Sequence, residues 1–189
     1  MRIITLALGL VVSATSMADW NLQSPSSIHF LTTKNAQVTE TNSFTSFSGK
    51  INKFGYAKLN IDLASVDTRI GIRDERIQEH LFETETFSQA HFEAEIPPTV
   101  LEQAIDGTTT YYDLKGKITL HGEQAEGYCQ VIISPNKNGT VTVTSVTPMM
   151  IDAQGFSLVK GINKLQEIAG LTSITYTVPL TFSLTFKAD

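Results

Sequence analysis

Asp67, Arg73 and Asp74 are the residues of this chain best suited to polar chemistry. They bring two carboxylates and a guanidinium together within one short stretch of the sequence. One hypothesis is that they clamp the polar head group of a ligand at the entrance of a binding site, because a guanidinium pairs well with oxygen anions. The alternative is structural, since Ser, Asp and Thr side chains around 65–68 are typical of turns and helix starts. We favour the structural interpretation, with Arg73 paired to a carboxylate.

Catalytic and metal-binding patterns are not found elsewhere in the sequence. The four histidines show no H-x-x-x-H spacing, and no G-x-S-x-G, phosphate-loop or dinucleotide motif occurs. Glu83 and Glu85 form a carboxylate pair, but they lie in a charged connector where solvation is the ordinary explanation. Cys129 lies in an alternating apolar run, which favours a small buried side chain over a nucleophile. We therefore predict a protein that is not an enzyme, with no metal and no cofactor. The histidines are His29, His80, His91 and His121.

The charge of the chain argues against polyanionic partners. The formal net charge is -5, and the basic residues do not gather into a stripe of the kind that nucleic acid or an anionic lipid surface attracts. A single cysteine allows no internal disulfide, so the stability of the fold must come from its apolar core.

The first eighteen residues resemble an export signal. Arg2 gives a positive start, residues 3–12 are almost wholly apolar, and Ser16 and Ala18 form a small-x-small cleavage site. The apolar run is too short to span a bilayer. We predict cleavage after Ala18, which leaves residues 19–189 as a single exported domain that does not span a membrane.

The remaining elements are mainly β-strands that must enclose a core. Apolar and polar residues alternate over 58–63, 112–120 and 173–186, which is typical of strands with one buried face. Helical spacing is clearest over 70–82 and 155–170, and 99–105 is a weaker candidate. One or two short helices cannot cover so much sheet, whereas a closed sheet hides its own apolar face and removes its edges. The sequence therefore predicts a mainly β fold, an antiparallel barrel of about eight strands.

Several of these segments together resemble the YceI-like family. The resemblance rests on the strand and turn at 61–68, the Arg73-Asp74 pair, Leu81-Phe82, Phe87 and Phe92. Weaker matches extend it over most of the chain, at 27–30, 44–49 and 114–122. The family consists of small secreted bacterial proteins described as polyisoprenoid-binding. The resemblance implies a lipocalin-like barrel located in the periplasm, and a homodimer is a further expectation from it.

This resemblance leads to a specific functional hypothesis. The chain is expected to be a periplasmic binding or carrier protein that holds a long apolar lipid in the barrel, such as an isoprenoid quinone or a polyprenyl lipid. The alternatives are a stress-related interaction protein with no ligand and, least favoured, a lipid-modifying enzyme. Asp67, Arg73 and Asp74 would lie at the mouth. The residues expected to line the barrel are Phe30, Phe44, Phe47, Leu59, Ile61, Leu63, Phe92, Ile118, Leu120, Tyr176, Val178, Leu180 and Phe182.

Overall fold

The computed structural model describes residues 19–189, so the export signal expected at 1–18 lies outside the described residues. Alternating sequences form long antiparallel strands, and short helices join some of them. The strands are β1 (Trp20–Lys34), β2 (Val38–Phe44), β3 (Phe47–Ile51), β4 (Tyr56–Asp62), β5 (Val66–Asp67), β6 (Gln89–Glu95), β7 (Thr110–Leu120), β8 (Glu123–Pro135), β9 (Thr140–Ser145), β10 (Met149–Asp152) and β11 (Thr177–Ala188). The helical elements are η1 (Leu63–Ser65), α1 (Gly71–Ile77), η2 (Gln78–Phe82), α2 (Pro98–Ile105), η3 (Ala153–Phe156) and α3 (Val159–Ile168).

Eight of the strands close into an antiparallel barrel. Neighbouring strands follow the order β1, β3, β4, β6, β7, β8, β9 and β11, and β11 pairs with β1 to complete the ring. Side chains of one parity face the interior, as in β7, where Leu114, Ile118 and Leu120 are buried. The mainly β, antiparallel barrel predicted from the sequence is confirmed.

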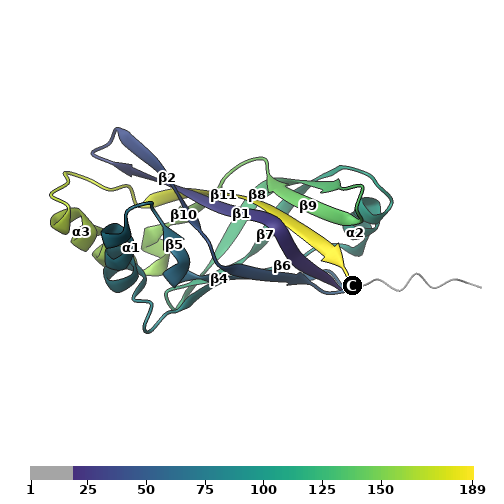
Figure 1. Ribbon diagram of the computed structural model, residues 1–189, viewed down its shortest axis with the longest axis horizontal. Coiled ribbons are helices and arrows are strands. Elements are labelled where there is room, and N and C mark those ends of the chain that lie inside the picture. The colour runs from purple at the N-terminus through teal and green to yellow at the C-terminus, as the bar shows by residue number, and fades with distance from the viewer. Residues whose placement is uncertain (1–18) are drawn as a thin grey trace, which may run out of the picture.

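The remaining strands lengthen one end of the barrel. β1 is long enough to pair with β3 near its start and with β2 near its end, and β5 adds to β2. β10 adds to the first residues of β11. Helices α1 and α3 lie at this end, whereas α2 lies at the opposite end (Figure 1). The two ends of the barrel are therefore covered by different elements.

Two helical segments pack tightly over the extended end. α1 continues into η2, a single turn of π-helix that buries Phe82 and ends at Glu83, whose backbone is left-handed. α3 packs against η2 through Gly161, where a Cβ atom would lie only 2.5 Å from the carbonyl oxygen of His80. Any larger residue would push the helices apart, so the close cover over this end of the barrel depends on Gly161.

Two details differ from the sequence predictions. The described residues contain three α-helices rather than one or two, because the weaker candidate at 99–105 forms α2. The last strand begins at Thr177 rather than at 173, although alternation runs through both. Residues 172–174, just before this strand, are instead held by contacts with Lys34 and Asn35 at the end of β1. The Asn35 side chain accepts a hydrogen bond from the Thr172 backbone N–H at 2.9 Å, and Ile174 makes only an isolated bridge to Lys34.

Candidate functional site

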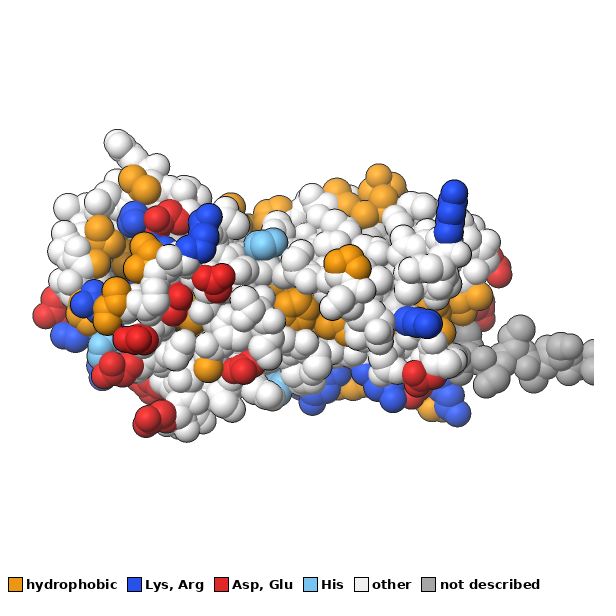
Figure 2. Space-filling model, viewed as in Figure 1, with side chains coloured by type: hydrophobic (Ala, Val, Ile, Leu, Met, Phe, Trp, Pro, Cys, Tyr) orange, Lys and Arg blue, Asp and Glu red, His pale blue; other side chains and the backbone are white. Residues whose placement is uncertain are grey.

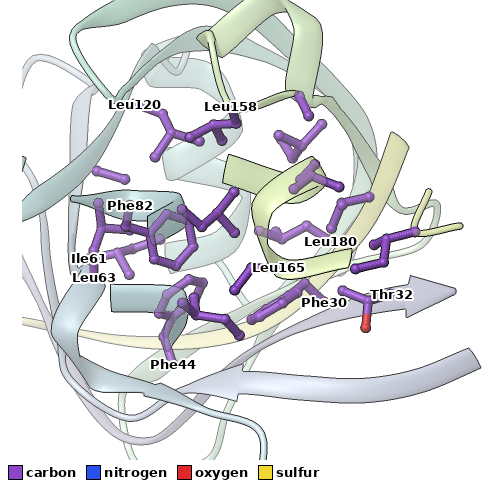
Figure 3. Close-up of a pocket in the computed structure, with 18 of the residues that line it drawn as sticks. Phe30, Thr32, Phe44, Ile61, Leu63, Phe82, Leu120, Leu158, Leu165 and Leu180 are labelled. Carbon is purple, nitrogen blue, oxygen red and sulfur yellow. The ribbon is translucent and has the colours of Figure 1, made fainter. Parts of the chain in front are cut away.

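A cavity of about 500 Å³ occupies the end of the barrel beneath α1 and α3. Strands β1, β4, β7 and β11 form its walls, and η2 and α3 close over it. In Figure 3, Phe82 from η2, Leu165 from α3 and Leu180 from β11 surround the same space. The cavity is thus built by segments from the whole length of the chain.

The wall of this cavity is almost entirely apolar. Aromatic rings follow one side of it, with the centroids of Phe30 and Phe44 5.2 Å apart and those of Phe44 and Phe82 6.0 Å apart. Aliphatic side chains such as Leu63 and Leu158 supply most of the rest. A space of this size and character suits an apolar ligand, because pockets for small ligands are typically about 300–1,000 Å³.

Charged residues gather where the cavity opens. Glu40 lies between two cations, with its Oε2 atom 3.0 Å from Lys34 Nζ and 2.7 Å from Arg73 Nη1. The hydrogen bond from Lys34 and the positive charge of Arg73 hold the pKa of Glu40 below its usual value. Ile70 and Ile72 line the same opening and are exposed. Figure 2 shows exposed apolar side chains mixed with charges of both signs at this end of the molecule.

Asp67, Arg73 and Asp74 all stabilise the turn that leads into α1. Asp67 Oδ1 accepts a hydrogen bond from the Arg69 backbone N–H at 2.7 Å, and Asp74 Oδ1 accepts one from the Thr68 N–H at 2.9 Å. Arg73 Nη2 donates to the Thr68 carbonyl at 2.7 Å. These are the contacts that the structural interpretation expects. Arg73 also lines the cavity, so a contact between Arg73 and a ligand stays a prediction.

The structure places eleven of the thirteen predicted lining residues around the cavity, and Phe47 and Tyr176 are not among the residues that line it. Tyr176 precedes β11, and its hydroxyl donates to Asn163 Oδ1 at 2.8 Å instead. Phe47 begins β3, directly after the break that separates β3 from β2, and is half-buried. Phe47 pairs with Ile61 in the ladder and packs against the core outside this cavity, whereas Tyr176 precedes the ladder although alternation runs through it. The eleven are Phe30, Phe44, Leu59, Ile61, Leu63, Phe92, Ile118, Leu120, Val178, Leu180 and Phe182; whether they contact a ligand stays a prediction.

Sequence reasoning missed the contribution of the helices and of β10 to the cavity. The helical spacing over 70–82 and 155–170 is visible in the sequence, but it does not show that these helices lie over an open end of the barrel. An amphipathic helix beside a barrel signals a cavity wall only when the helix lies over an open end. The missed lining residues include Ile77, Phe82, Met149, Ile151, Leu158, Ile162 and Leu165.

Cys129 and His121 are not among the residues that line this cavity, whereas His91 is. Burial raises the pKa of the Cys129 thiol to about 11, so it stays protonated at neutral pH. His121 packs on Phe87 with ring centroids 4.3 Å apart, and its Nε2 lies 3.5 Å from Glu83 Oε2. Within 19–189, His, Cys, Asp and Glu side chains nowhere form a group of three that could hold a metal ion. Among the same residues, none of the helices has the length and apolar composition needed to cross a membrane.

Comparisons with solved structures identify relatives of this fold. A polyisoprenoid binding domain from Saccharophagus degradans, implicated in plant cell wall breakdown, is 32% identical, with a TM-score of 0.85 over 90% of this chain and 98% of that one. BcnA from Burkholderia cenocepacia is 21% identical, with a TM-score of 0.65 over 85% of this chain and 95% of that one. A YceI protein from Campylobacter jejuni is 15% identical, with a TM-score of 0.56 over 76% and 82%. The two more distant structures share the fold.

The family assignment comes from the sequence itself. Comparison with curated proteins found no match. The sequence matches the YceI-like domain over residues 20–186, which is nearly all of the part that the structure describes. This chain belongs to the YceI-like family.

Proposed function

We propose that this protein binds a long apolar lipid, an isoprenoid quinone or a polyprenyl lipid, with its chain inside the barrel. The observation that carries the proposal is the apolar cavity of about 500 Å³ beneath α1 and α3. A stress-related scaffold without a ligand would have no need of such a space. The relative from Saccharophagus degradans, described as a polyisoprenoid binding domain, supports the same class of ligand.

Burial of the chain would supply the affinity. Each methylene moved from water into an apolar site contributes about 0.8 kcal/mol. The cavity wall offers few polar partners, so binding would be reversible and would involve no covalent step. We expect the protein to carry its ligand rather than to change it.

The charges at the mouth favour an uncharged head group. Lys34 and Arg73 are both within 3.0 Å of the same carboxylate oxygen of Glu40. A phosphate or carboxylate head group would have to compete with Glu40 for these two cations, and would face its negative charge. A quinone ring or an alcohol could lie beside the mouth without breaking either ion pair.

The proposed location is the bacterial periplasm, after removal of residues 1–18. A periplasmic protein could carry lipid between membranes through water. N-terminal sequencing of the protein from its host tests this proposal, with Asp19 expected as the first residue. An intact first segment would contradict it.

Native mass spectrometry of protein purified from its own host is the experiment that tests the binding function. We expect one lipid molecule per chain, and organic extraction followed by mass spectrometry would identify it. Ile151→Trp should fill part of the cavity and lower the bound fraction, because Ile151 lines it. Met150→Trp is the matched control, since Met150 is the adjacent, exposed residue of β10. A wild-type protein that never carries lipid from its host would contradict the proposal.

A further inference from the structure

A second, smaller cavity lies deeper in the barrel. It measures about 70 Å³ and is lined by residues such as Trp20, Leu114 and Phe186. Helix α2, at the end of the barrel opposite to α1 and α3, contributes Leu101 to it. The lumen therefore contains a large cavity near the mouth and a small one beyond it, both apolar.

Four side chains line both cavities and form the partition between them. We call this set the septum; it consists of Leu59, Phe92, Phe182 and Leu184. Leu59 and Phe92 are direct partners on β4 and β6. The other two lie on β11, separated from β4 by β3 and β1 and from β6 by β7, β8 and β9. The septum is thus built from opposite walls of the barrel, whose side chains approach across the lumen.

The backbone holds one ring of the septum in position. Gly116 on β7 lies against Phe92, and a Cβ atom at Gly116 would overlap the end of the Phe92 ring. The same Cβ would lie 2.5 Å from the carbonyl oxygen of Glu93. The missing side chain at Gly116 therefore gives the Phe92 ring a fixed place against β7, and β7 and β6 approach closely at this level of the barrel.

We infer that the septum sets the length of chain that the protein binds, an inference that rests on the proposed function. An apolar cavity of about 150 Å³ holds one benzene ring, which is about 25 Å³ per carbon, so the large cavity would hold roughly 20 carbons. This corresponds to about four isoprene units. Carbons beyond that number would remain at the mouth in water, where they gain no burial energy.

The volume of the small cavity predicts how many more carbons the protein should hold once the septum is opened. Its volume of about 70 Å³ would add roughly 3 carbons by the same ratio, and removal of a phenyl ring would add about 6 more. Phe182→Ala should therefore join the two cavities and admit one to two further isoprene units. Phe186→Ala is the matched control, because it removes the same ring from the same face of β11 but lines only the small cavity, behind the septum.

Affinities for linear isoprenoid alcohols of graded length test this inference on delipidated, purified protein. The probes are farnesol, geranylgeraniol, geranylfarnesol, hexaprenol and solanesol, measured by displacement of a fluorescent fatty acid. For the wild type we expect affinity to rise up to geranylgeraniol and then level off. For Phe182→Ala the levelling point should move to a longer alcohol by at least one isoprene unit, with a gain of at least about tenfold for that alcohol relative to geranylgeraniol. Phe186→Ala should level off where the wild type does.

The possible results separate this inference from the function on which it rests. If the wild type binds none of the alcohols and carries no lipid from its host, the proposed function and the septum inference both fail. If the wild type binds them but all three proteins level off at the same alcohol, only the septum inference fails. It also fails if Phe186→Ala shifts the levelling point as much as Phe182→Ala does. Phe182→Leu and Phe186→Leu, checked by circular dichroism, give the same comparison should the alanine variants not fold.

Discussion

The two halves of the barrel have the same strand pattern but different interiors. The half beneath α1 and α3 encloses about 500 Å³, whereas the half near α2 encloses about 70 Å³. Both are built from strands whose inward faces are apolar, and β11 contributes to both. In the half near α2, large side chains such as Trp20, Leu114 and Phe186 surround the small cavity. In the other half, β2, β5 and β10 lengthen the wall and α1 and α3 cover the end.

This difference shows that two properties are separate: whether a side chain faces the lumen, and whether the side chains facing it fill the lumen. Alternation decides which side chains face the lumen, because its period matches the pleat. Whether those side chains fill the lumen depends on their volumes and on what covers the barrel end. A barrel half that its own large side chains fill forms a core, and a half whose helices cover an unfilled lumen can enclose a ligand.

The largest expected effect comes from truncating matched residues in the two halves. Ile133 is buried in the filled half, so Ile133→Ala should cost about 2–5 kcal/mol, the usual range for a cavity made in a packed core. Leu180 borders the large cavity and is only half-buried, so Leu180→Ala enlarges an existing space and should cost less than about 2 kcal/mol. Urea denaturation of lipid-free protein gives both values. Equal costs would mean that the two halves are equally packed.

Sequence reasoning reached the barrel and most of its inner face, and it failed at particular positions for physical reasons. Ile61, Ile118 and Leu120 were predictable because each lies within a regular strand. Tyr176 was not, since alternation runs through it in the sequence although β11 begins only at Thr177. Phe47 pairs with Ile61 in the ladder and packs against the core, but it does not line the cavity, and a local pattern does not show how far along the lumen a cavity extends. The cavity and the septum depend on how closely side chains from distant strands approach across the lumen. A local sequence pattern does not predict the distance between strands that are far apart in the sequence.

The next comparison adds volume instead of removing it. Phe182 and Phe186 lie on the same face of β11, the first in the septum and the second in the filled half. Phe186→Trp should cost about 1–3 kcal/mol through overpacking, whereas Phe182→Trp should cost less because the larger ring can extend into the open cavity. Phe182→Trp should also lower the amount of bound lipid. Thermal melting of lipid-free protein measures the difference, and a stronger loss for Phe182→Trp would contradict an open cavity in the half beneath α1 and α3.

A smaller effect is expected at the mouth of the open half. Arg73→Ala removes hydrogen bonds to the Thr68 carbonyl and to Glu40, so it should lower stability by roughly 1–2 kcal/mol. Lys34 remains to pair with Glu40, which limits the loss. Arg76→Ala is the control, because Arg76 lines the same opening without taking part in these bonds. If Arg73→Ala leaves the denaturation curve unchanged and weakens lipid binding, Arg73 is a head-group contact and not a structural residue.

The smallest expected effect is on the loss of stability in acid, and it compares two carboxylates, Glu40 at the mouth of the cavity and Glu93 on β6. Lys34 and Arg73 lower the pKa of Glu40 at the mouth, and Lys58 and Tyr56 lower that of Glu93 on β6 through hydrogen bonds. When folding lowers the pKa of a carboxyl group, that group stabilises the fold at pH values above its pKa in the unfolded chain, which is 4.5 for both residues. This stabilisation is lost as the pH falls through the lower pKa of the folded state. Glu40→Gln and Glu93→Gln should each therefore flatten the loss of stability on acidification.

The two variants should differ in what happens to the ligand. Protonation of Glu40 breaks its ion pairs with Lys34 and Arg73 at the opening of the cavity. Glu93 instead pairs with Lys58 and lies 4.0 Å from Lys117. Glu93, Lys58 and Lys117 do not line the large cavity. Acid should thus weaken lipid retention in the wild type and in Glu93→Gln, and should change it less in Glu40→Gln, where the cations are already free of a carboxylate. Lipid release measured from about pH 6 to pH 3 at constant salt makes this comparison. Equal pH profiles in all three proteins would show that the ion pairs at the mouth hold the fold together without controlling access to the cavity.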